Sequence, residues 1–167
     1  MSSRRGFLAL LLASLGGCGF RIRGTAEVPF DTLYLPGATS GIALDLKRYI
    51  QAGTNARVLD DPAKADAVMQ FTEEARQKEV LSLTGTGKVR EFQLRYRVGF
   101  RVHDNKGTDF VPPSVIQLTR DVTFNDAEIL AKEQEEQILF RDMQTDMVQQ
   151  ILRRLAAAKR QPKPAAP

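Results

Sequence analysis

Four basic side chains stand where predicted elements of this chain meet, and their chemistry suits an anionic ligand. Lys88 and Arg90 come at a glycine-bearing turn between two predicted strands, and Arg120 and Lys132 flank the junction of the last strand with the last helix. In a two-layer fold these positions are expected to converge at one end of the sheet. A charge-assisted hydrogen bond to phosphate contributes about 1.5–3 kcal/mol, so two or three of them hold an anionic headgroup. An ordinary solvated surface is the competing interpretation of the same residues.

The only cysteine, Cys18, follows a segment that is typical of an export signal. A short start with two arginines, residues 1–5, precedes an apolar run over residues 7–15 and then two glycines. The run is shorter than the ~20 residues that span a bilayer, so residues 1–17 are predicted to be a signal peptide that is removed. A leucine and two glycines before Cys18 resemble a bacterial lipobox, in which the cysteine thiol takes a diacylglycerol and becomes the first mature residue.

The residues around Cys18 also indicate a destination. Gly19 stands where inner-membrane lipoproteins often have aspartate, so by resemblance to lipoprotein sorting rules the chain is expected to be lipid-anchored in the outer membrane. Two or more acyl chains make such anchoring lasting, because burial is worth about 0.8 kcal/mol per CH₂ and a single chain is marginal. Residues 3–8 also resemble a twin-arginine export signal, and both export routes stay open.

Removal of the signal peptide changes the charge balance. It takes away Arg4 and Arg5 and no acidic residue, which lowers the formal net charge from +4 to +2. Binding of an anionic ligand therefore depends on where the charges sit and not on the total. No nucleic-acid partner is expected.

Catalytic chemistry finds little support in the sequence. The only histidine, His103, ends a predicted strand beside a turn, where a surface histidine is the simpler interpretation. No cluster of histidine and cysteine suits a metal, and no G-x-S-x-G motif is present. The segment Gly85–Lys88 lacks the spacing of a phosphate-binding loop and precedes a strand instead of a helix. We expect a non-enzymatic protein without a cofactor.

The stretch Phe92–Val102 organises the predicted fold. Every even position is a large apolar residue, and the odd positions hold Gln, Arg, Arg, Gly and Arg. This unbroken period of two predicts a β-strand with one face in the core and the other in water. Arg95, Arg97 and Arg101 line the second face, which has no obvious cover within this chain.

Patterns on either side of this strand complete the fold. The predicted elements, in order, are a strand within 29–36, a helix at 42–53, two long strands from about 66 joined by a turn at 84–88, a strand after 113, and a helix from 126 to about 158. Residues 56–59 are interpreted as a short extended piece. The arrangement predicts an α+β fold: a two-layer sandwich of an about four-stranded sheet with two helices packed on one face.

The last helix carries a clear amphipathic pattern. Asn125 followed by Glu128 is typical of a capping box. The apolar stripe, interpreted as core, holds Leu139, Met143, Met147, Ile151 and Leu155. The acidic residues Glu133, Glu135 and Glu136 are interpreted as the solvated face. Residues 159–167, with three prolines and three basic residues, are predicted to be a disordered tail.

Three segments together resemble the LptE family, the lipopolysaccharide-assembly lipoproteins of Gram-negative outer membranes. They are Cys18–Gly24 after the lipobox, Gly87–Leu94 in the hairpin, and Arg120–Asp126 running into Leu130–Glu135. None is a catalytic signature, and their order and spacing carry the resemblance over nearly the whole mature chain. The family-like domain is expected to span residues 18–158.

The resemblance implies a non-enzymatic role. Members of the family form a heterodimer with the β-barrel LptD, act as its plug and assembly factor, and bind lipopolysaccharide on its way to the cell surface. Lys132 matches the lysine at the start of the last helix that contributes to lipopolysaccharide binding in that family. The family's basic residue in the hairpin turn aligns near Gly85 here, so Lys88 or Arg90 is expected to replace it.

The remaining cations are given roles by the same resemblance. Arg95, Arg97 and Arg101 are expected to contact the barrel wall, because charges on an uncovered face suit a polar lumen. Arg120, which interrupts the apolar row of the last strand, joins the expected lipopolysaccharide-binding set. The alternative is an outer-membrane lipoprotein that serves another envelope machine through protein contacts alone. It predicts that charge reversal at the lysines leaves function intact.

Overall fold

The computed structural model describes residues 27–158. The predicted signal peptide, Cys18 with its lipobox, and the tail at 159–167 lie outside these residues. Among the residues described, no helix combines the length and the apolar character needed to cross a membrane.

One long strand, β4 (Val89–His103), runs through the middle of the molecule. Leu94, Tyr96 and Phe100 are fully buried on one of its faces, whereas Arg97 on the other face is exposed. The alternation predicted from the sequence is confirmed.

Five strands form one mixed sheet in the order β2-β1-β3-β4-β5. The long strands β3 (Ala67–Leu83), β4 and β5 (Asp109–Thr123) pair antiparallel, and the short strands β1 (Thr32–Tyr34) and β2 (Arg57–Leu59) add parallel pairs. The α+β prediction is confirmed, and the five strands are close to the about four expected. The additional strand is β2, which was interpreted as a short extended piece because three residues are too few to show a period of two, and which becomes a strand through its pairing with β1.

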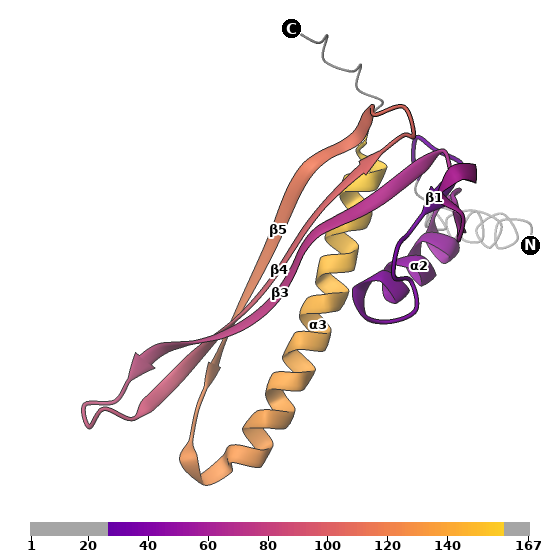
Figure 1. The fold of residues 1–167 in the computed structure, drawn as a ribbon. Helices are drawn as coiled ribbons and strands as arrows, with labels where there is room; N and C mark the ends of the chain where they lie inside the picture. The colour runs from indigo at the N-terminus through magenta and orange to yellow at the C-terminus, as the bar shows by residue number, and fades with distance from the viewer. Residues whose placement is uncertain (1–26, 159–167) are drawn as a thin grey trace, which may run out of the picture.

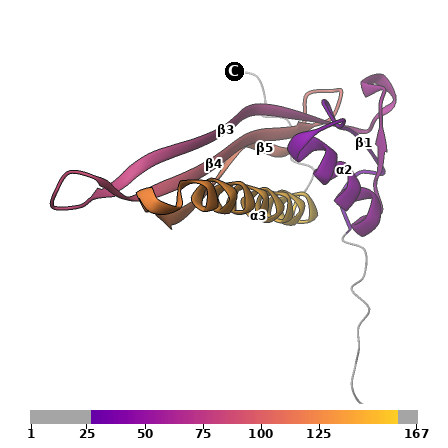
Figure 2. The ribbon, with the colours of Figure 1, turned by 90° about the horizontal axis from the view of Figure 1, so that it is seen from below.

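Both helices cover the same face of this sheet (Figure 1, Figure 2). α2 (Gly41–Gly53) buries Ile42, Leu46 and Ile50 against the short strands and α3. α3 (Ile129–Ala156) runs along the long strands for roughly 42 Å, at about 1.5 Å per residue. The residues that α3 buries are Phe140, Met143, Met147, Val148, Ile151 and Leu155.

α3 begins slightly later than the sequence predicted. Residues Asp126–Glu128 form a short 3₁₀ turn, η3, and Asn125 caps that turn by accepting the Ala127 N–H at 3.1 Å. Glu128 then occupies the N-cap position of α3 without a side-chain capping bond. The predicted cap at Asn125 therefore serves the 3₁₀ turn and not α3 itself.

β5 also differs from the prediction, because it includes Pro112 and Pro113 instead of starting after them. Proline has no N–H to donate, so strands tolerate it at a sheet edge or at an irregularity. β5 is an edge strand, and its register with β4 shifts between Phe100 and Val102, next to the prolines.

The face of β3 that meets α3 changes character along the strand. Near its start Met69 is buried in the core, whereas Glu74, Arg76 and Lys78 occupy the same face farther along. The Tyr96 hydroxyl donates to Glu74 at 2.8 Å, and the Arg76 guanidinium lies 4.9 Å from the centre of the Tyr96 ring. Burial, together with the hydrogen bond to Glu74, raises the pKa of Tyr96. Toward the β3–β4 turn, polar contacts therefore replace apolar packing.

Candidate functional site

Lys132 lies where β5 passes into α3, in the first turn of the helix. Its ammonium donates to Thr123 Oγ1 at 3.2 Å and to Glu135 Oε2 at 2.8 Å, and 18% of its side chain is exposed. A lysine ammonium has three donors. With two engaged by described residues, the third is available to a ligand that approaches from solvent.

The β3–β4 turn brings Lys88 to the same connection. Its ammonium pairs with Asp126 of η3, with 3.0 Å between Nζ and Oδ2, and 71% of its side chain is exposed. The Phe124 N–H donates to the Arg90 carbonyl oxygen at 2.8 Å, which ties the connection to the base of the turn. Lys88 and Lys132 therefore both lie at the β5–α3 connection, so these two of the four predicted cations lie together at one end of the sheet.

The other two predicted cations lie in different surroundings. Arg90 is exposed two residues after Lys88, and its side chain has no hydrogen bond or ion pair with any residue in the described range. Arg120 donates to Asp146 of α3 at 2.8 Å. Asp146 lies roughly 20 Å along the helix axis from Lys132, at about 1.5 Å per residue. The structure thus brings three cations, Lys88, Arg90 and Lys132, to one end of the molecule and directs Arg120 elsewhere. We refer to these three as the distal cations.

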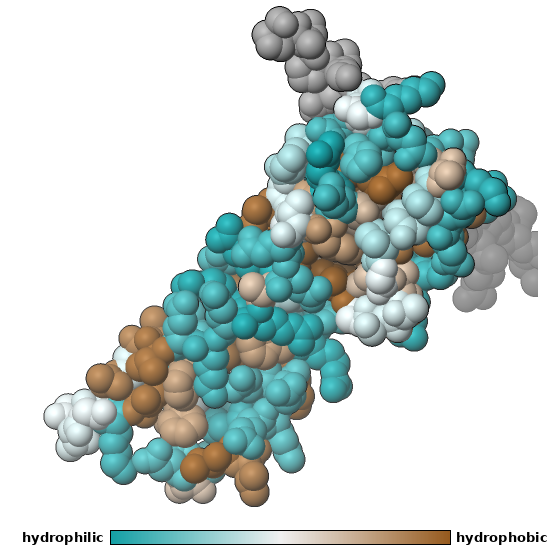
Figure 3. Space-filling view, in the orientation of Figure 1, coloured by the Kyte–Doolittle hydropathy of each residue, from teal (hydrophilic) through white to brown (hydrophobic). Residues whose placement is uncertain are grey.

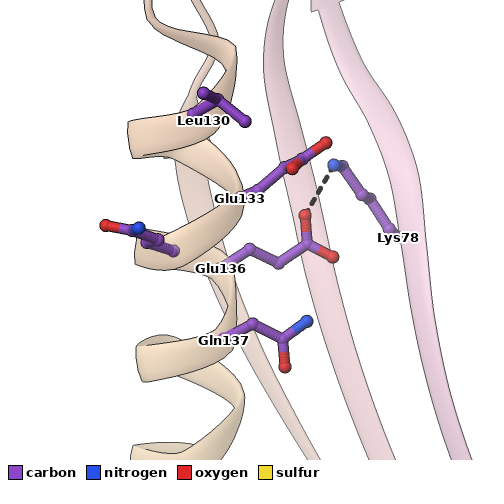
Figure 4. Close-up of a pocket in the computed structure, with 6 residues that line it drawn as sticks. Lys78, Leu130, Glu133, Glu136 and Gln137 are labelled. Carbon is purple, nitrogen blue, oxygen red and sulfur yellow. Dashed lines mark hydrogen bonds and ion pairs between the residues drawn. The ribbon is translucent and has the colours of Figure 1, made fainter.

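A groove of about 500 Å³ separates β3 from the first turns of α3 (Figure 4). Lys78 reaches across it to Glu136, with 2.6 Å between Nζ and Oε2, and its ammonium lies 4.3 Å from the centre of the Phe92 ring. The groove is lined by Lys78, Leu130, Glu133, Gln134, Glu136 and Gln137.

The assignment of Glu136 to the solvated face of the helix is wrong, because only 19% of its side chain is exposed. Glu136 stands four residues before Phe140 and so continues the buried stripe of α3. That spacing is the signal in the sequence that would have placed it against β3. Glu135 is also engaged, through the hydrogen bond from Lys132.

The sheet face opposite the helices carries the predicted row of arginines, and no helix in the described range covers it (Figure 2). Each arginine pairs with a carboxylate on a neighbouring strand: Arg95 with Glu79 at 2.9 Å, Arg97 with Glu73 at 3.0 Å, and Arg101 with Asp109 at 2.7 Å. The face is therefore polar and charge-balanced. Sequence reasoning identified the arginines but not the carboxylates, because their pairing depends on the strand register.

The residues considered for catalysis lie at the two turns that precede and follow β4. Thr84 donates its N–H to the Lys88 carbonyl oxygen at 2.7 Å, which closes the turn that contains Gly85. His103 is half-buried at the end of β4, with Nδ1 2.8 Å from the Asp104 carbonyl oxygen. Within residues 27–158, no three carboxylate or imidazole side chains are grouped as metal ligands would be.

Comparison with known proteins supplies the family. Residues 27–155 match the family model LptE, described as lipopolysaccharide-assembly. The chain belongs to the LptE family. A curated relative, the LPS-assembly lipoprotein LptE of Photorhabdus laumondii, is 28% identical over 151 residues, which cover 89% of this chain and 82% of the relative.

Solved structures agree with this assignment. The uncharacterized lipoprotein B of Nitrosomonas europaea, solved by NMR in solution, is 41% identical with a TM-score of 0.72, over 80% of this chain and 87% of that one. The rare lipoprotein B of Shewanella oneidensis, a crystal structure, shares the fold at 24% identity with a TM-score of 0.65, over 76% of this chain and 95% of that one. The chain is thus a lipoprotein of the LptE family with the α+β fold of its relatives.

Proposed function

We propose that this LptE-family lipoprotein is anchored in the outer membrane through Cys18, forms a heterodimer with the β-barrel LptD as its plug and assembly factor, and binds lipopolysaccharide during delivery to the cell surface. Family membership over residues 27–155 supports the role in lipopolysaccharide assembly. The binding role rests on the position of Lys132. It is half-buried at the β5–α3 connection, and two of its three ammonium donors are engaged by described residues, which leaves the third for a ligand.

The distal cations suit the phosphate groups of the ligand. The exposed ion pair between Lys88 and Asp126 is worth only about 0–1 kcal/mol, so a phosphate that forms charge-assisted bonds of about 1.5–3 kcal/mol competes for Lys88. Arg90 offers a planar donor set for bidentate contacts. Lys132, in the first turn of α3, is held by Thr123 and Glu135 and supplies a positioned donor beside them.

The shape and charge of the molecule suit a plug. β3 alone extends over roughly 55 Å at about 3.3 Å per residue, and the sheet and helix layers make a long, narrow body (Figure 1). Lumens of membrane barrels are polar. The open sheet face can lie against such a wall without an unpaired charge, because Arg95, Arg97 and Arg101 already have carboxylate partners that water or wall residues can supplement.

The partner is tested by recovering the lipidated protein from detergent-solubilised outer membranes and identifying what remains bound. The expected result is a stoichiometric large β-barrel recognisable as LptD. Recovery of the protein alone, or with a different machine, contradicts the plug role.

Lipopolysaccharide binding is tested with charge reversals at Lys132 and Lys88. Each is expected to weaken binding about tenfold or more, equivalent to about 1.4 kcal/mol or more. The matched control is Lys64→Glu, which reverses an exposed lysine paired with Asp61 near the start of β3, far from the turn. If Lys132→Glu binds as tightly as Lys64→Glu, the protein acts through protein contacts alone, as the alternative requires.

A further inference from the structure

The tip of the β3–β4 hairpin, residues 80–90, exposes large apolar side chains. Leu81 is 47% exposed and Leu83 is 56% exposed, and Val80 beside them is exposed as well. Figure 3 shows hydrophobic residues gathered at this end of the molecule, next to the paler residues of the turn. The hairpin turns away from α3 in this region (Figure 1), and about half of the surface of each of these side chains is open to solvent.

The same tip is cationic. Residues 80–90 contain Lys88 and Arg90 and no acidic residue. The nearest carboxylate partner of Lys88, Asp126, belongs to the β5–α3 connection and not to the hairpin. The tip therefore combines exposed hydrocarbon with positive charge within eleven residues, and long basic side chains can keep their charged ends in water while their stems lie on apolar surface.

The turn at the end of the hairpin pairs three of its backbone N–H groups within itself, those of Thr84, Gly87 and Lys88. The Thr84 N–H donates to the Lys88 carbonyl oxygen at 2.7 Å, and the Gly87 N–H donates to the Thr84 carbonyl oxygen at 2.9 Å. The Lys88 N–H donates to Thr84 Oγ1 at 3.1 Å. Backbone groups that meet hydrocarbon must be paired internally, because lipid offers them no partner. These three N–H groups can therefore approach an apolar medium without losing a hydrogen bond to water.

We propose that the hairpin tip is an acyl-chain contact: Leu81 and Leu83 lie against the hydrocarbon chains of the lipopolysaccharide that the distal cations hold by its phosphates. The proposal rests on the proposed function and extends it from the charged part of the ligand to the apolar part. An anionic glycolipid presents phosphates and acyl chains next to each other, which is the arrangement of cations and leucines at the tip. A protein partner for the leucines is the competing occupant, and the two cations of the tip, Lys88 and Arg90, favour the anionic lipid.

The decisive experiment compares intact lipopolysaccharide with the same molecule after chemical removal of its acyl chains. The full mature protein carries Leu81→Ser with Leu83→Ser, and a matched control carries Val115→Ser with Ile138→Ser, two exposed apolar residues on β5 and α3. The tip variant is expected to bind intact ligand about tenfold more weakly and deacylated ligand unchanged. The control variant is expected to bind both as the unaltered protein does.

A second variant, Leu81→Met with Leu83→Met, keeps an apolar tip and is expected to retain binding, which separates lost hydrocarbon contact from misfolding. Unchanged binding of intact ligand by the serine variant, or an equal loss for both ligands, overturns the acyl-chain contact. Normal ligand binding with loss of the barrel partner on purification overturns it too, because the tip is then a protein contact. Lys132→Glu, which weakens both ligands if the proposed function holds, tests that function separately.

Discussion

Gly99 and Thr72 lie so close together that a Cβ atom on Gly99 would come within 2.5 Å of the Thr72 hydroxyl oxygen. The register of β3 against β4 shifts between Phe71 and Glu73, so Thr72 is the extra residue of a bulge beside Gly99. The glycine in the middle of the arginine row is therefore required by close approach of the neighbouring strand.

We expect Gly99→Ala to lower the free energy of unfolding by about 1–3 kcal/mol, the usual range for overpacking in a tight site. Urea denaturation measures the change. Gly85→Ala is the matched control, because nothing lies within 4 Å of a Cβ built there. Adding Thr72→Ala to Gly99→Ala should recover part of the loss, since it removes the hydroxyl and leaves the weaker approach to Glu73. No difference between the two glycine variants would contradict the steric explanation.

The ion pair between Lys78 and Glu136 is expected to hold the hairpin to α3. Glu136 is 19% exposed and Lys78 is 35% exposed, so Lys78→Met leaves a largely covered carboxylate without its partner and should lower the free energy of unfolding by about 1–2 kcal/mol. A double-mutant cycle with Glu136→Gln should give a coupling energy of about 1 kcal/mol. The exposed pair Lys64 and Asp61 is the control, with a coupling of about 0.5 kcal/mol or less. Equal coupling energies for the two pairs would contradict the proposal that the Lys78–Glu136 ion pair holds the hairpin to α3.

Packing of α3 gives a third prediction. Met143 is fully buried between α3 and the sheet, whereas Ile138 on the same helix is mostly exposed. Met143→Ala should therefore cost about 2–5 kcal/mol of stability, through lost burial and the cavity that remains. Ile138→Ala should change stability by about 0.5 kcal/mol or less. Thermal or urea unfolding of the two variants measures the contrast, and a similar cost for both would place the core elsewhere.

The sequence was sufficient to predict features that depend on one secondary-structure element alone. The alternation along Phe92–Val102 predicts β4, its faces and its arginine row, because period two is a property of one strand. It was insufficient to predict features that depend on how two distant segments of the chain pair. β2 exists through its pairing with β1, and the Arg97–Glu73 ion pair follows from the register of β3 against β4.

The candidate site shows the same division. Lys88 and Lys132 were expected near the end of the sheet, and the order of the elements alone places them there. Arg120 was expected to join them, but its direction depends on Asp146, a partner in the second half of α3 that no local pattern reveals. Glu136 was missed for a different reason, since a charged residue at a stripe position was interpreted as solvated although its spacing from Phe140 places it toward β3.

The buried hydroxyl of Tyr96 predicts how stability depends on alkaline pH. Burial and the hydrogen bond to Glu74 raise the pKa of Tyr96 above its ordinary value of about 10, so the folded state disfavours the ionised form. Below pH ~10 the residue is neutral in both the folded and the unfolded protein, and its contribution is fully present. As the pH rises above ~10, only the unfolded chain releases this proton, and stability falls by at most about 1.4 kcal/mol per pH unit.

Tyr96→Phe should remove that dependence. At neutral pH the variant loses the hydrogen bond to Glu74 and about 0.5–1.5 kcal/mol of stability. Between pH 10 and 12, roughly, its free energy of unfolding should fall less steeply than that of the unaltered protein, so the two curves approach each other. Urea denaturation at a series of pH values measures both slopes, and lysine deprotonation affects both proteins alike. Parallel curves would mean that Tyr96 ionises as easily in the folded protein as in the unfolded chain, which contradicts its burial beneath α3.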